Sequence, residues 1–110
     1  MTDRSELVSA CRELERRLEG SPQTDRLKAV YLDLSMLLGR IQGALNDAQR
    51  HSGQTPETLA AQVSFDELRR TVRQVGFDIR LASPTALQVG LQTALEQALE
   101  TLDHLMDHDL

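Results

Sequence analysis

Apolar residues recur at intervals of three and four positions along most of the chain, a spacing that places them on one side of an α-helix. Short stretches with glycine or proline interrupt this pattern near residues 20–22, 53–56 and 83–84. Each helix must bury its apolar side, and short connections favour antiparallel neighbours. The pattern therefore predicts an all-α fold: an antiparallel up-and-down bundle of about four helices, forming a single domain over residues 1–110.

The helices are expected at about residues 3–19, 21–50, 55–82 and 83–107. Gly20 is expected to end the first helix in a left-handed conformation. A serine or threonine followed by proline opens each later helix, because the hydroxyl can cap free amide groups and proline fits the first turn.

The third helix has two competing interpretations. Ser64 and Glu67 form a capping-box pattern, so the helix could be broken near Ser64. The stretch GFDIRL, residues 76–81, also alternates in the manner of a strand. A lone strand would have no partner within this chain, so we expect a helix there.

The second helix has apolar residues on two opposite sides. Its core side is expected to hold Leu27, Val30, Tyr31, Leu34, Leu37, Leu38, Ile41, Ala44, Leu45 and Ala48. The opposite side carries a second row, called the outer stripe below, made of Ala29, Leu32, Met36, Gly39 and Gly43. Polar residues separate the two rows. A second apolar side indicates that something covers it.

The two glycines of the outer stripe each cost about 1 kcal/mol relative to alanine in a helix, so a close contact is expected to compensate. Either another helix of the same chain covers the stripe, or a second copy or another protein does. The first helix is about 25 Å long and the second about 40 Å. An antiparallel first helix would therefore end near Gly39 or Gly43 and leave room for a further helix.

Composition narrows the function classes. Leucine and alanine must build the core, because the chain has two Phe, one Tyr and no Trp. A net charge of −5 disfavours a general nucleic-acid binder. Cys11 is the single cysteine and lies on the apolar side of the first helix, which suggests a buried thiol in a reducing compartment. With no signal-peptide pattern and no apolar run long enough to span a membrane, we expect a cytoplasmic protein, and the arginine-rich usage suggests a bacterial source.

Three histidines form the best chemical cluster. His104 and His108 are four residues apart, a workable spacing for two ligands on one helix face. In an up-and-down bundle His51, at the end of the second helix, would lie near them. This predicts either a zinc-type site or a contact that responds to pH near neutrality.

Arginines gather on the third helix, where Arg69, Arg73 and Arg80 lie roughly on one side. The default expectation is that they pair with acidic residues near the end of the chain. An acidic partner protein and nucleic acid are the alternatives.

No catalytic motif accompanies these features, so we expect a protein without enzymatic activity or cofactor. The leading hypothesis is a protein-interaction module, such as a regulator, adaptor, inhibitor or chaperone-like protein, that forms a homodimer through the outer stripe. The alternatives are a metal- or pH-responsive sensor and a nucleic-acid accessory protein.

Overall fold

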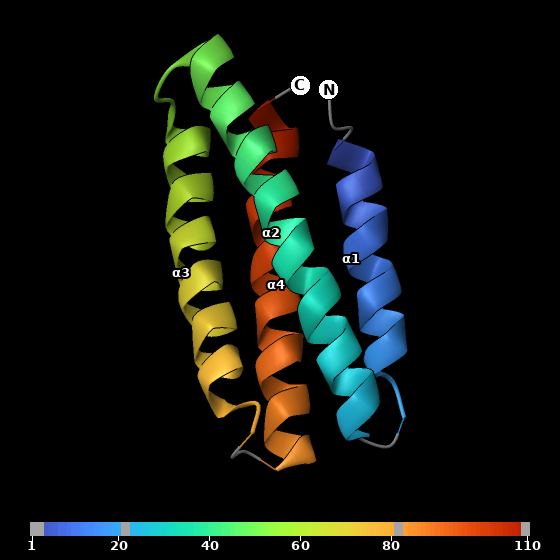
Figure 1. The fold of residues 1–110 in the computed structure, drawn as a ribbon. Helices are drawn as coiled ribbons and strands as arrows, with labels where there is room; N and C mark the ends of the chain where they lie inside the picture. Colours follow the sequence, from blue (N-terminus) through green and yellow to red (C-terminus); the bar gives the residue numbers. More distant parts are fainter. Residues whose placement is uncertain (1–3, 21–22, 81–82, 109–110) are drawn as a thin grey trace.

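The computed structural model describes residues 4–20, 23–80 and 83–108, and for residues 106–108 the backbone alone. The described residues form four antiparallel helices in up-and-down order (Figure 1). Their bounds are Arg4–Leu18 for α1, Thr24–Ser52 for α2, Pro56–Asp78 for α3 and Pro84–His108 for α4. The predicted helical bundle is confirmed.

The helix ends follow the local signals. Gly20 has φ 97°, the left-handed conformation expected after α1. Thr55 caps α3, because its hydroxyl accepts a hydrogen bond from the amide of Thr58 at 3.2 Å. The Ser83 hydroxyl accepts a hydrogen bond from the amide of Ala86 in the same way. The expected start of α2 at residues 21–22 lies outside the described residues, and α2 itself begins at Thr24.

The alternative of a break near Ser64 is wrong, because α3 continues through this residue as one helix. Ser64 is 5% exposed and faces the core beside Phe65 and Leu68. A capping residue has an extended backbone, and its side chain binds amide groups that lack a partner in the first turn. Because α3 is continuous through residue 64, the amide groups that follow Ser64 already bond carbonyl oxygens of the preceding turn. The strand alternative at residues 76–81 is also wrong as far as Asp78, where the helix ends.

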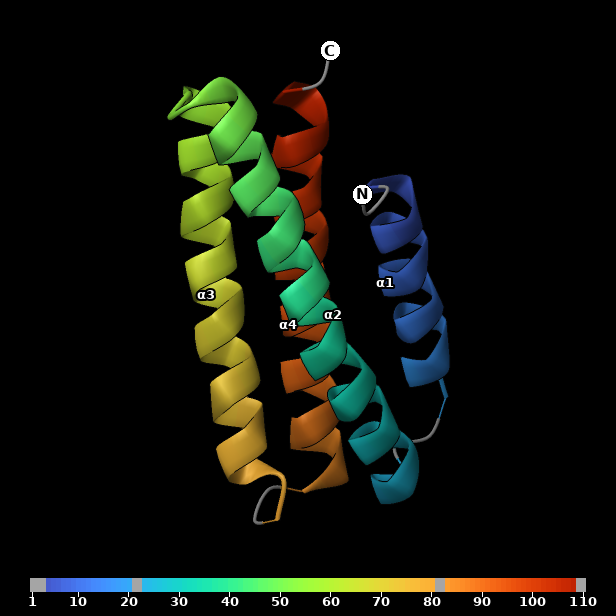
Figure 2. The same cartoon turned by 45° about the horizontal axis from the view of Figure 1, so that its top comes forward.

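The helices α2 and α4 form the middle of the bundle. Each contacts all three other helices, whereas α1 and α3 do not touch within the described chain. Figure 1 shows α2 crossing in front of α4, with α1 and α3 on either side, and Figure 2 shows the same order after rotation. The outward side of α2 therefore has no helix in front of it.

The first helix covers about half of α2, as its length predicts. Arg17 near the end of α1 pairs with Asp33 of α2 at 2.6 Å, and Glu6 near its start lies 3.9 Å from Arg40. Arg40 also lines a groove together with Ala10 of α1, so α1 still flanks α2 at this level, and the last turns of the longer α2 extend past it. As expected from the lengths of the two helices, α1 covers the earlier part of α2 and leaves its last turns uncovered.

Two other glycines mark the close helix contacts. A Cβ atom at Gly76 of α3 would lie 2.5 Å from the Tyr31 hydroxyl oxygen of α2. A Cβ atom at Gly90 of α4 would lie 2.9 Å from Val75 Cγ2 of α3. Close approach inside the bundle thus occurs at these positions and not at the outer stripe.

Candidate protein-interaction surface on α2

The outer stripe is exposed. Leu32 is 61% and Met36 is 74% exposed, and both glycines lie at the surface, while Ala29 is half-buried. The core side of α2 is buried as predicted, with Tyr31 and Leu38 partly buried against it. Coverage of the outer stripe by another helix of the same chain is therefore wrong, because α2 meets its three neighbours with its core side.

Gly39 and Gly43 have open space around them. A Cβ atom built at either position meets no other atom within 4 Å. The expectation that a close contact compensates these glycines is thus not met inside the chain. They make the second half of the stripe narrow and flat, next to the bulky side chains of Leu32 and Met36.

A shallow groove borders the stripe on the side of α1. Its volume is about 270 Å³, and its lining residues are Ala10, Glu13, Leu14, Arg17, Asp33, Met36, Leu37 and Arg40. The Met36 side chain belongs both to the groove and to the stripe. An apolar group placed on the stripe would therefore also contact the groove.

Polar residues form a row along each edge of the stripe. The row beside α1, called the charged row below, consists of Arg26, Asp33, Arg40 and Asp47. The row on the other edge is called the neutral row below, because only its first residue is charged. It consists of Lys28, Ser35, Gln42 and Gln49. The Gln49 side-chain amide donates a hydrogen bond to Gln62 Oε1 of α3 at 3.1 Å, which places the end of this row beside α3. An apolar centre with polar edges is the usual arrangement of a protein interface.

The arginines of α3 do not pair with the acidic residues of α4. Arg69, Arg70 and Arg73 lie on α3, whereas Arg80 lies in the turn after α3 ends at Asp78 and not on the helix as expected. All four side chains are exposed, and none has an ion pair within the described chain. The expected intramolecular pairing is therefore wrong. The acidic residues Glu96, Glu100 and Asp103 instead line a groove of about 550 Å³ between α1 and α4.

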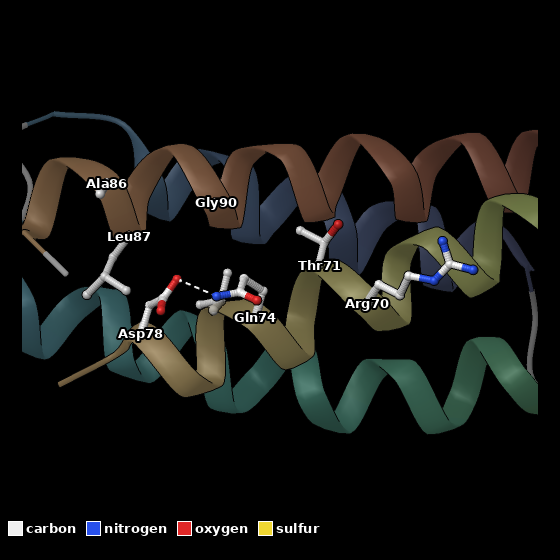
Figure 3. A pocket seen from close by; sticks show the side chains of 8 residues that line it. Arg70, Thr71, Gln74, Asp78, Ala86, Leu87 and Gly90 are labelled. Atoms are coloured by element: carbon white, nitrogen blue, oxygen red, sulfur yellow. Dashed lines mark hydrogen bonds between the residues drawn. The ribbon is translucent and has the colours of Figure 1, made fainter. Parts of the chain in front are cut away.

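Two features near these arginines were not expected from the sequence. Phe77, on α3, is 73% exposed. A pocket of about 380 Å³ lies between α3 and α4, with Arg70, Gln74 and Asp78 on one side and Leu87 and Gly90 on the other (Figure 3). The signal for Phe77 was available, because it falls outside the heptad spacing that places Val72, Val75 and Ile79 toward the core.

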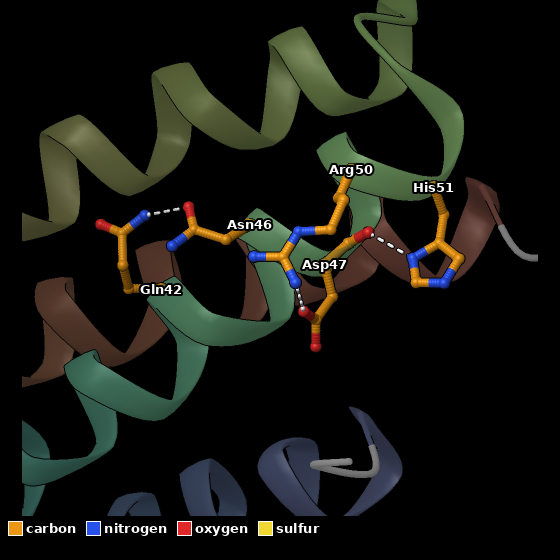
Figure 4. A network of polar contacts seen from close by, with 5 residues as sticks. All are labelled: Gln42, Asn46, Asp47, Arg50 and His51. Atoms are coloured by element: carbon orange, nitrogen blue, oxygen red, sulfur yellow. Dashed lines mark hydrogen bonds and ion pairs between the residues drawn. The ribbon is translucent and has the colours of Figure 1, made fainter.

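The histidines whose side chains the structure describes do not come together in a metal site. His51 is exposed at the end of α2, and its Nδ1 donates a hydrogen bond to the carbonyl oxygen of Asp47 at 2.8 Å (Figure 4). His104 is half-buried, with Nε2 3.9 Å from Glu100 Oε1. The side chain of His108 lies outside the described residues, and the side chains that are described form no metal-binding group of three. The three-histidine site stays a prediction.

Cys11 is fully buried in the core. Burial, with a smaller contribution from the nearby Glu15 carboxylate, raises the pKa of its thiol to about 11. The thiol is thus neutral near pH 7 and inaccessible, which fits a structural role and not a nucleophile.

No protein-family model matches this chain, and no curated protein or solved structure shows significant similarity to it. None of the helices, over the residues that the structure describes, has the length and apolar character to cross a membrane.

Proposed function

We propose that this protein is a non-enzymatic interaction module that functions as a homodimer through the outer stripe of α2. The observation that carries the proposal is the exposure of Leu32 and Met36 on the side of α2 that faces away from the bundle. Among the side chains that the structure describes, the other large apolar ones that are exposed lie on α3 and α4.

The energetics support a partner on this face. Burying a leucine or methionine side chain contributes about 1.5–3 kcal/mol relative to leaving it in water. A symmetric dimer buries the same patch twice, so each side chain counts two times. The missing side chains at Gly39 and Gly43 let a second backbone approach closely, which gives a role to residues that otherwise only weaken the helix.

The test compares two charge insertions at exposed apolar positions. Met36→Glu places a carboxylate in the stripe, and Leu59→Glu places one on α3 as a matched control, because Leu59 is also exposed. We expect Met36→Glu to weaken self-association at least about tenfold, which corresponds to about 1.4 kcal/mol. Leu59→Glu should leave association unchanged.

Sedimentation equilibrium measures the association, and circular dichroism confirms that both variants keep their helices. Equal effects of the two variants on association would contradict a specific role for the stripe. Loss of helical structure in Met36→Glu would show instead that Met36 supports the monomer, which its exposure does not predict.

A further inference from the structure

We infer that the second copy lies antiparallel on the outer stripe, in the register that places Met36 of each copy over Gly39 of the other. This inference rests on the proposed homodimer and specifies its geometry. It is carried by two independent observations, the sizes of the residues along the stripe and the charges along its edge.

The first observation is that the stripe has a bulky half and a small half. In an antiparallel pair, a step forward on one helix meets a step backward on the other. Contact between Met36 and Gly39 therefore also places Leu32 over Gly43, so each bulky side chain meets a position without a side chain. The space above both glycines is open in the monomer. Packing of large residues against small ones lets two surfaces interlock without a void.

The second observation is the alternation of charge in the charged row. Arginine and aspartate alternate there at intervals of seven residues, which is the repeat of a helix pair. In the proposed register Asp33 faces Arg40 of the second copy, and Arg26 faces its Asp47. By symmetry each pair occurs twice, and every pair joins opposite charges.

The same register also fits the ends of the stripe and the neutral row. Asp25 precedes the apolar stretch, and Asn46 and then Arg50 follow it on the same side of the helix. The register brings Asp25 opposite Arg50 and Ala29 opposite Asn46. In the neutral row Lys28 faces Gln49, and the uncharged Ser35 faces Gln42. No like charges meet on either side of the stripe.

Neighbouring registers are disfavoured by the charged row. A slide of seven residues in one direction places Asp33 opposite Asp33 of the second copy and Arg26 opposite its Arg40. A slide in the other direction places Arg40 opposite Arg40 and Asp33 opposite Asp47. Like charges would face each other throughout, and such contacts oppose association.

A parallel arrangement in register is disfavoured by size and charge. It would place Met36 on Met36 and glycine on glycine, which crowds one half of the interface and leaves a gap in the other. It would also bring the two copies of Asp25 together.

The charged row is available for these contacts. The side chains of Asp33 and Arg40 are 49% and 48% exposed even though they pair with Arg17 and Glu6 of α1. Exposed ion pairs of this kind hold their partners weakly, so each side chain can join a second partner across the interface.

A charge-exchange experiment tests the register at Arg26 and Asp47, whose contacts within the chain are slight. Arg26 donates a hydrogen bond to the carbonyl oxygen of Glu19 at 3.3 Å, and Asp47 lies 3.9 Å from Arg50. The variants are Arg26→Glu, Asp47→Arg and both together. Each single variant turns two facing opposite-charge pairs into like-charge pairs, and the double variant restores opposite charges.

We expect each single variant to weaken the dimer about fivefold at low ionic strength and the double variant to return close to the original affinity. Additive weakening in the double variant would overturn the register. Sedimentation equilibrium measures the affinities, and thermal unfolding confirms that the monomer is intact.

Distances between spin labels test the orientation independently. Lys28→Cys and Gln42→Cys place labels on the neutral row, and Cys11 does not compete because it is fully buried. An antiparallel pair separates the two labels at residue 28 by about 30 Å along the helix axis and those at residue 42 by about 10 Å. Equal separations at the two sites would overturn the antiparallel arrangement.

These outcomes separate the register from the homodimer itself. A chain that stays monomeric at all concentrations contradicts the proposed function. A dimer that Met36→Glu disrupts, but that shows equal label distances and no charge rescue, retains the proposed function and contradicts the register.

Discussion

The space around a glycine in a helix depends on which other helix faces it. Gly39 and Gly43 lie in open space, whereas a Cβ atom at Gly90 would press against Val75. The sequence presents all three as glycine inside a helical pattern, and it led us to expect close contact at Gly39 and Gly43. Which helix faces a glycine is decided by packing between distant segments, so local spacing could not distinguish these cases.

Stability measurements should separate the two kinds of glycine. Gly39→Ala and Gly43→Ala should each raise the free energy of unfolding of the monomer by about 0.5–1 kcal/mol, because alanine restricts the unfolded chain and its methyl group meets nothing. Gly90→Ala should lower it by about 1 kcal/mol, because Val75 is stiff and overpacking outweighs the gain in helix propensity. Urea unfolding of dilute protein measures all three. A stabilised Gly90→Ala would show that α3 and α4 adapt easily.

Cys11 makes stability depend on pH in the alkaline range. Burial disfavours the thiolate and raises the pKa of this thiol from its ordinary value of 9.0 to about 11 in the folded chain. The unfolded chain therefore loses the proton first. The contribution of this thiol to the free energy of unfolding is fully present below pH 9. It decreases by roughly 2–3 kcal/mol as pH rises to 11.

Unfolding free energies measured between pH 8 and 11 would show this decrease, which is on the order of 1.4 kcal/mol per pH unit within the affected range. The slope should be smaller in Cys11→Ala, whatever stability that variant loses through the cavity it creates. Identical slopes in both proteins would show that the thiol does not contribute.

Individual helices were more predictable than the relations between them. Heptad spacing placed the core side of α2 correctly, and Thr55 with Pro56 marked the start of α3. The break at Ser64 was wrong because a capping pattern inside a continuous apolar stripe does not end a helix. The pairing of α3 arginines with α4 was also wrong, since Glu96, Glu100 and Asp103 line the opposite groove beside α1. Helix-to-helix facing depends on rotations that no single segment encodes.

The unpaired arginines of α3 give a prediction at the level of this helix. Arg73 is three and four residues from Arg70 and Arg69, so the three like charges repel. Arg73→Glu should raise the free energy of unfolding by about 0.5 kcal/mol at low ionic strength, and the effect should fade with salt. Arg73→Gln should give about half of the gain. A loss of stability in Arg73→Glu would indicate that Arg73 has an acidic partner within the chain.

At the scale of the whole molecule, the arrangement of the bundle explains why one side of α2 stays open. Because α1 and α3 lie on either side of α2 and do not meet in the described chain, neither crosses its outward side. The short α1 leaves the last turns of α2 freer still. The sequence predicted the bundle and the two-sided α2, but only the packing showed that the outer stripe lies outside it. We propose that a second copy of the chain binds the outer stripe.

Sedimentation equilibrium of the unmodified chain tests this central claim most directly. The measured mass should rise from 12.3 kDa, the mass of one chain, toward twice that value as concentration increases from about 1 µM to about 1 mM. A constant mass of 12.3 kDa over this whole range would contradict a homodimer on the outer stripe.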